Sequence, residues 1–70
     1  MNTNTNNIQL IDKMLLGARV VGFGGITFNE DEREIIIAVT SNAEGEIIIH
    51  TIDNDFNVHI RNLAGCKLKF

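Results

Sequence analysis

Apolar residues occur in short runs along most of the chain, and polar or glycine residues separate these runs at intervals typical of β-strands and turns. Four runs follow one another after residue 33: residues 34–41, 46–53, 56–62 and 66–70. An earlier run, residues 18–28, contains three glycines, and glycine inside a strand usually marks a bulge or a sharp bend. The pattern predicts about five short strands in a small, strongly bent barrel, with residues 18–28 as either one bent strand or two.

The N-terminal part of the chain has a different period, because apolar residues within positions 8–16 recur at helical spacing. Gly17 follows at the position where a glycine commonly ends a helix. Residues 1–7 are polar and uncharged, and we expect them to form a disordered tail. These features predict a single domain over residues 8–70, mainly β, in which a short N-terminal helix precedes the five-stranded barrel.

Two isoleucine triplets, residues 35–37 and 47–49, predict strands that are apolar on both faces. Successive side chains of a strand point to opposite faces, so each triplet presents isoleucine both to the barrel interior and to the outside. One short helix cannot cover the outside of such a barrel, and a domain of 70 residues rarely gains more than about 3–5 kcal/mol from its core. We favour an interface between subunits for the outer isoleucines, and the alternative is an exposed isoleucine that the fold tolerates.

Charge is distributed unevenly along the chain, whose net charge is −3. Eight of the nine acidic residues lie within positions 30–55, whereas residues 56–70 contain Arg61, Lys67 and Lys69 and no acid. A molecule with an acidic middle and a basic end can associate head to tail, and such an interface closes into a ring when the rotation allows. The alternative is that these charges only keep exposed loops soluble.

Side chains suited to catalysis are sparse. Ser41 and Cys66 are the only serine and the only cysteine, and neither has a base at a recognised spacing. The glycine-rich stretch at residues 22–25 is not followed by a predicted helix, which argues against nucleotide binding. The acids Glu30, Asp31, Glu32 and Glu34 are expected to belong to a solvated loop. We therefore expect no enzymatic activity, no cofactor and no metal.

The two histidines are predicted to lie opposite each other on paired strands. If residues 54–55 form a two-residue hairpin loop, the pairing places His50 directly across from His59. Two facing imidazoles could share a metal, or repel each other when protonated near pH ~6. The simpler interpretation is a polar cross-strand pair.

Residues 52–60 (IDNDFNVHI) resemble the first signature of the Sm and Sm-like RNA-binding proteins. In that signature a strand leads into an aspartate, two further residues, a large apolar residue, an asparagine and another apolar strand. The matching residues are Asp53, Phe56 and Asn57. Residues 63–68 (LAGCKL) are similar to the second signature, with Ala64 at the position of its basic residue. The leading helix and the small bent barrel also resemble this family.

The resemblance implies an SH3-like or Sm-like barrel that forms a homo-oligomeric ring through edge strands and binds single-stranded RNA rich in uridine or adenine. It also implies that Asn57 bonds a base edge, Phe56 stacks on a base and Asp53 braces the loop. Loops of this kind suit single-stranded bases, which offer both ring faces and polar edges. We add Arg61 and Lys67 as candidate phosphate contacts.

Our second hypothesis is a small acidic module that binds a protein, such as an inhibitor encoded by a phage. Its acidic face, which extends from Glu30 to Glu46, would engage a basic host protein. A purely structural oligomer is a third possibility. The chain has no apolar run of ~18 residues, and the single cysteine forms no internal disulfide, so we expect a cytoplasmic protein with no membrane partner.

Overall fold

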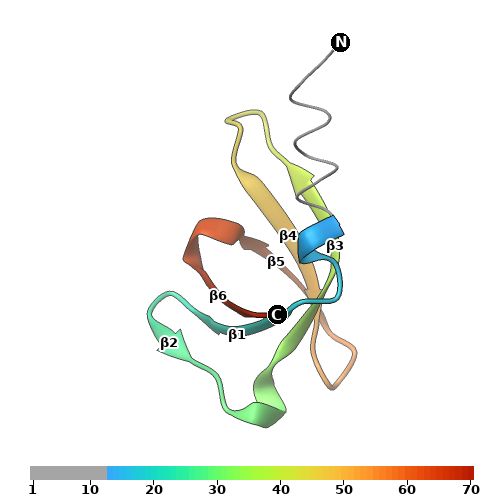
Figure 1. Ribbon diagram of the computed structural model, residues 1–70, viewed down its shortest axis with the longest axis vertical. Coiled ribbons are helices and arrows are strands. Elements are labelled where there is room, and N and C mark those ends of the chain that lie inside the picture. Colours follow the sequence, from blue (N-terminus) through green and yellow to red (C-terminus); the bar gives the residue numbers. More distant parts are fainter. Residues whose placement is uncertain (1–12) are drawn as a thin grey trace.

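The computed structural model describes residues 13–70 and contains a mainly β domain (Figure 1). Of the predicted helix at residues 8–16, residues 13–15 are helical and Leu16 already belongs to a turn, so the predicted N-terminal helix is not supported; residues 8–12 and the predicted tail lie outside the described residues. The elements that follow are β1 (Arg19–Phe23), β2 (Ile26–Thr27), the 3-10 helix η1 (Glu30–Glu32), β3 (Glu34–Ser41), β4 (Ile47–Ile52), β5 (Val58–Asn62), the 3-10 helix η2 (Leu63–Gly65) and β6 (Cys66–Lys69). No helix within residues 13–70 is long and apolar enough to cross a membrane.

The strands form one antiparallel sheet that curls into a half-barrel, which confirms the prediction of a mainly β, strongly bent sheet (Figure 1). Five longer strands follow the order β6-β1-β3-β4-β5, and the two-residue β2 extends the β3 side of β1. β5 and β6 are the two ends of the curled sheet. Within residues 13–70, each of them has one edge without a partner strand.

The glycine-rich run at residues 18–28 forms two strands rather than one bent strand. Gly24 and Gly25 connect β1 to β2, and both have positive φ angles, 62° and 85°, that glycine adopts without steric penalty. Gly22 pairs with Thr27, and a Cβ at Gly22 would lie 2.5 Å from the carbonyl oxygen of Ile26. The chain can therefore reverse direction tightly here only because these positions lack side chains.

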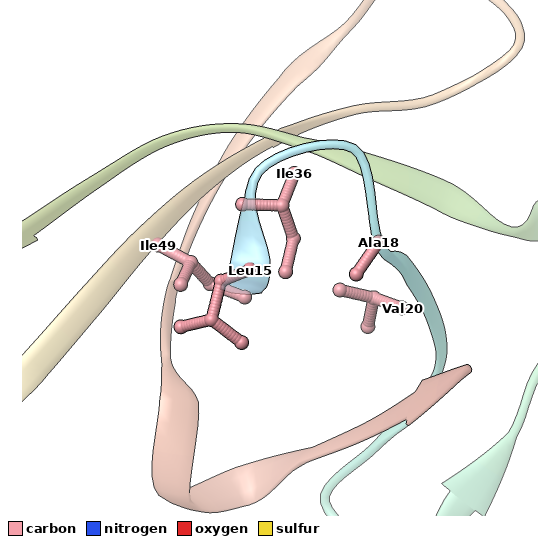
Figure 2. Packing of buried hydrophobic residues seen from close by; sticks show 5 residues of the cluster. All are labelled: Leu15, Ala18, Val20, Ile36 and Ile49. Carbon is pink, nitrogen blue, oxygen red and sulfur yellow. The ribbon is translucent and has the colours of Figure 1, made fainter. Parts of the chain in front are cut away.

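The apolar core lies inside the curl of the sheet (Figure 2). Its buried members are Leu15, Ala18, Val20, Ile36 and Ile49. Half-buried residues, including Phe28, Leu68 and Cys66, pack against this cluster. The core contains the middle residue of the first isoleucine triplet and the last residue of the second. This small cluster links the helical residues 13–15 to the sheet.

The other side of β3 and β5 carries exposed aliphatic side chains, which we call the outer apolar face: Ile35, Ile37, Val58 and Ile60. Ile35 is opposite Ile52 of β4, which in turn is opposite Val58. These side chains share one face because directly paired residues of antiparallel strands point the same way. The outer isoleucines of the first triplet are therefore exposed in the single chain.

The connection between β4 and β5 is longer than the predicted two-residue loop. The backbone N–H of Phe56 donates to the carbonyl of Asp53 at 3.1 Å, and the N–H of Asp53 donates to the carbonyl of Asn57 at 3.0 Å. Phe56 has a φ of 66°, in the left-handed region. This is a tight turn followed by a left-handed residue that forms a bulge, a common hairpin geometry. We call residues 53–57 the Asp53 loop.

The longer loop moves the pairing of β4 and β5 by one residue. His50 is opposite Ile60, and His59 is opposite Thr51. The predicted pair of facing histidines is therefore wrong, because a shift of one residue exchanges the faces of a strand. His50 lies on the outer side of the sheet, and His59 lies on the inner side with the fully buried Thr51.

Candidate functional site

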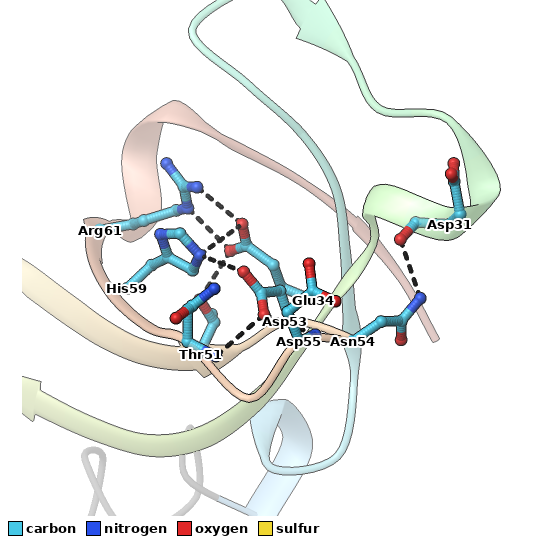
Figure 3. Close-up of polar contacts among 9 residues, drawn as sticks. Asp31, Glu34, Thr51, Asp53, Asn54, Asp55, His59 and Arg61 are labelled. Carbon is cyan, nitrogen blue, oxygen red and sulfur yellow. Dashed lines mark hydrogen bonds and ion pairs between the residues drawn. The ribbon is translucent and has the colours of Figure 1, made fainter.

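Glu34 is the centre of a buried polar network on the inner face of the sheet (Figure 3). Its carboxylate accepts hydrogen bonds from Arg61 Nε at 2.8 Å, Arg61 Nη2 at 2.7 Å and Thr51 Oγ1 at 2.6 Å. The expectation that Glu34 belongs to a solvated loop is wrong, since only 3% of the residue is exposed. Glu34 is two positions before the buried Ile36 in β3, so the alternation of the strand points both residues inward.

Arg61 is enclosed by aromatic rings as well as by its partner carboxylate. Its guanidinium carbon lies 4.9 Å from the centre of the Phe23 ring and 5.6 Å from that of Phe28. The bidentate pair with Glu34 uses two of its nitrogens and neutralises its charge. This geometry makes Arg61 a part of the barrel interior. It leaves little of the guanidinium for the phosphate contact expected from the sequence.

His59 extends the network from Glu34 to the Asp53 loop. Its Nε2 lies 2.8 Å from Asp53 Oδ2 and 3.9 Å from Glu34 Oε2. A single imidazole therefore lies between two carboxylates. Together we call Glu34, Thr51, Asp53, His59 and Arg61 the polar network.

Asp53 holds the loop in shape through its second carboxylate oxygen. Asp53 Oδ1 accepts hydrogen bonds from the backbone N–H groups of Asp55 and Asn57, both at 2.9 Å. The side-chain amide of Asn54 donates to the carbonyl of Asp31 at 2.8 Å, which ties the loop to η1. These bonds within the loop, and from the loop to the rest of the domain, fix its conformation without any ligand.

The charges of the polar network are set by these contacts. Burial disfavours the charged form of Glu34, but hydrogen bonds from its partners and the positive charge of Arg61 outweigh burial and hold its pKa below the usual value. The hydrogen bond with His59 is the main cause that lowers the pKa of Asp53. The hydrogen bond to Glu34 raises the pKa of Arg61. Both carboxylates and the guanidinium are therefore ionised at neutral pH.

Phe56 lies on the Asp53 loop with 83% of the residue exposed, although its backbone has a positive φ. Asn57 follows it and is also exposed. The structure thus brings together three of the residues predicted to bind RNA, Asp53, Phe56 and Asn57, and joins Arg61 to them through the polar network. Lys67 is different: it lies on β6, where its Nζ donates to Thr27 Oγ1 at 3.0 Å, and it makes no contact with this network.

A groove of about 390 Å³ opens beside the polar network, and we call it the acidic groove. Its lining includes five carboxylates, from Asp31, Glu32, Glu34, Asp53 and Asp55. Arg61 and His59, which also line it, are already bonded to Glu34 and Asp53 respectively. Among residues 13–70 no three His, Cys, Asp or Glu side chains are grouped so as to hold a metal ion.

Sequence reasoning missed the role of Glu34, Thr51 and His59. The position of Glu34 in the alternation of the strand could have revealed its burial: it is two residues before Ile36, so both side chains point to the same face. His59 was assigned to the wrong face because the loop was taken as two residues. The chain matches no protein-family model, no curated protein and no solved structure. Inferences about its function therefore depend on the geometry described above.

Proposed function

We propose that the protein is a ring-forming, Sm-like barrel that binds single-stranded RNA without catalysis, with the Asp53 loop as its contact. The observation that carries this proposal is the conformation of Phe56. A residue with a side chain costs about 1–2 kcal/mol more than glycine in the left-handed region. The phenyl ring is also 83% exposed, so its burial in this domain does not offset that cost. Strain of this kind is typical of residues kept for a contact outside the domain.

An exposed aromatic ring on a rigid loop suits the face of an unpaired base. Stacking of one base on an aromatic side chain contributes about 1–3 kcal/mol and tolerates different sequences. Asn57 is next to the ring, and its amide offers a donor and an acceptor for a base edge. Because Asp53 fixes the loop before RNA arrives, little conformational entropy is lost on binding.

Assembly into a ring is the second part of the proposal. The unpaired edges of β5 and β6 are available for strand pairing between neighbouring subunits. The exposed side chains of Val58 and Ile60 on β5 would lie beside such a junction. A ring would present one Asp53 loop per subunit, and several weak sites on one assembly bind a long strand more tightly than a single site.

RNA binding is tested with fluorescence anisotropy, using labelled single-stranded oligomers of uridine, of adenine and of cytosine. We expect Phe56→Ala to weaken binding of the preferred oligomer at least fivefold, the lower end of the contribution from one stacked base. Met14→Ala is the matched control, because Met14 is also highly exposed, at 68%, and lies on another element. Absence of binding by the wild type, or equal losses in both variants, would contradict the proposal.

The acidic groove supports a second candidate, the small module that binds a basic protein. The observation in favour of this candidate is that carboxylates outnumber cations in the lining of the acidic groove, and Arg61 in that lining is already paired with Glu34. An arginine-rich peptide is the appropriate probe. If this candidate is right, a combined Asp31→Asn and Glu32→Gln variant loses peptide binding, because both exposed acids line the groove, while Phe56→Ala retains it. If instead Phe56→Ala loses RNA binding while the combined Asp31→Asn and Glu32→Gln variant retains it, the first candidate is favoured.

A further inference from the structure

The guanidinium of Arg33 contains the one buried side-chain polar atom, among those described, that has no hydrogen-bond partner. That atom is Nε, a donor. A buried donor without an acceptor destabilises the fold, and the cost is larger when the donor belongs to a charged group. Arg33 lies directly between η1 and β3, so the fold keeps it half-buried at this position. An acceptor from outside the domain would remove this cost.

A hollow of about 330 Å³ lies at Arg33 and contains a second arginine. We call it the arginine hollow, and its lining is formed by Arg19, Glu30, Arg33, Glu34, Ile35 and Asn54. Within residues 13–70 neither arginine forms an ion pair. Glu34 lines the hollow as well, but its carboxylate is committed to Arg61 on the inner face. Glu30 is thus the only lining acid not already bonded to a cation.

A third cation lies directly beside Arg19. Arg19 of β1 is paired with Lys69 of β6, so the two side chains share one face of the sheet. Like charges opposite each other on neighbouring strands destabilise the sheet. Arg19 and Lys69 also line a second hollow, of about 250 Å³, next to the first. Arg19 thus lines both hollows, with Arg33 in the first and Lys69 in the second, and among residues 13–70 Glu30 is the one acidic side chain of these linings that is not already paired with a cation.

From these observations we infer that Arg19 and Arg33, with Lys69 beside them, form a binding site for a phosphate group. A phosphate oxygen accepts the orphan N–H of Arg33, and a second oxygen accepts from the same planar guanidinium, the bidentate geometry that arginine favours. The charge of a phosphate matches two arginines that form no ion pair within residues 13–70, with the ammonium group of Lys69 in the neighbouring hollow. This inference stands without the RNA proposal. It concerns residues that the sequence resemblance does not assign.

The phosphate has two possible sources, the backbone of RNA or a free phosphate compound. Asn54 lines both the arginine hollow and the acidic groove, and it belongs to the Asp53 loop. A strand stacked on Phe56 would thus have a phosphate close to the site. A free phosphate monoester would use the same donors without needing Phe56.

The test is a titration of the ¹⁵N-labelled protein with inorganic phosphate, followed by NMR against sodium chloride at the same ionic strength. We expect saturable shifts of the backbone amides at Arg19, Arg33 and Asn54. Arg33→Gln should raise the Kd for phosphate at least tenfold. Arg19→Gln, which changes an exposed side chain and should preserve the fold, should raise it at least threefold. Lys13→Gln removes one positive charge elsewhere and should leave the Kd unchanged.

Absence of saturable shifts, or an equal effect of Lys13→Gln, would overturn the site. RNA binding by the same variants then identifies the source of the phosphate. If Arg19→Gln weakens both phosphate and RNA, the source is the RNA backbone. If it weakens phosphate alone, the source is a free phosphate compound. Phe56→Ala should leave phosphate binding intact in either case, so failure of the RNA proposal is distinguishable from failure of this one.

Discussion

Phe56 combines two properties that are rarely found together, an exposed aromatic ring and a left-handed backbone conformation. Two substitutions separate the contribution of the ring from that of the backbone conformation. Phe56→Gly removes both the ring and the backbone strain, whereas Phe56→Ala removes only the ring. We expect the glycine variant to be more stable than the alanine variant by about 1 kcal/mol. Urea denaturation measures this difference, and equal stabilities would contradict a strained Phe56.

Glu34 is the residue on which the polar network depends most. Glu34→Gln leaves Arg61 enclosed without its counter-charge, so we expect the free energy of unfolding to fall by on the order of 3 kcal/mol. The combined variant Glu34→Leu, Thr51→Val and Arg61→Met replaces Glu34 together with both of its hydrogen-bond donors and should recover most of this loss. Thermal denaturation of both variants provides the measurement. If the triple variant is no more stable than Glu34→Gln, uncompensated charge is not the cause.

At the scale of elements, the β4–β5 hairpin depends on ionised carboxylates. The pKa values of Asp53 and Glu34 are lower in the folded chain than in the unfolded chain. The unfolded state therefore binds more protons in acid, so the stability present at neutral pH is lost as the pH falls through the folded pKa values. We expect the free energy of unfolding to decrease steadily below pH ~5.

The contribution of Asp53 to this acid sensitivity can be isolated. Asp53→Asn should lower the stability at pH ~7 and make the decrease in acid shallower, because one group with a lowered pKa is gone. Asp55→Asn is the matched control, since within residues 13–70 the Asp55 side chain makes no hydrogen bond and no ion pair. Denaturation curves at several pH values show both effects. If Asp53→Asn leaves the decrease of the unfolding free energy with falling pH unchanged, Asp53 is not a source of the acid sensitivity.

The positions of the strands could be predicted from the sequence, but the register of one hairpin could not. The predicted strand at residues 34–41 has the same limits as β3, because polar residues flank its apolar residues on both sides. In the Asp53 loop, the residue with positive φ is Phe56 rather than glycine or asparagine. Asn54 and Asp55 mark a turn, but the residue type at position 56 gives no sign of a left-handed conformation and therefore none of a third loop residue. His59 and Arg61 could therefore not be placed on the inner face in advance.

At the scale of the whole molecule, the half-barrel formed by residues 13–70 leaves two of its own strand edges unpaired and one apolar face exposed. We expect native mass spectrometry to give whole multiples of the 7.8 kDa chain mass. Ile60→Glu places a charge on the outer apolar face and should produce a monomer. Met14→Glu is the matched control, because the two residues are exposed to 69% and 68%. A monomeric wild type would contradict the ring, and dissociation by both variants would show that added charge, rather than this face, controls assembly.

The length of the Asp53 loop has a consequence for how the chain can vary. A strand repeats every two residues, so a two-residue loop at residues 54–55, which pairs residue 53 with residue 56 in place of residue 57, would exchange the faces of β5. Val58 and Ile60 would then fill the interior, His59 and Arg61 would point to solvent, and Glu34 would become a buried carboxylate without a cation. The pairing of β4 with β5 thus decides which β5 side chains face Glu34. A substitution that favours a two-residue turn at residues 54–55 would therefore remove the electrostatic partner of Glu34 without changing Glu34 or Arg61.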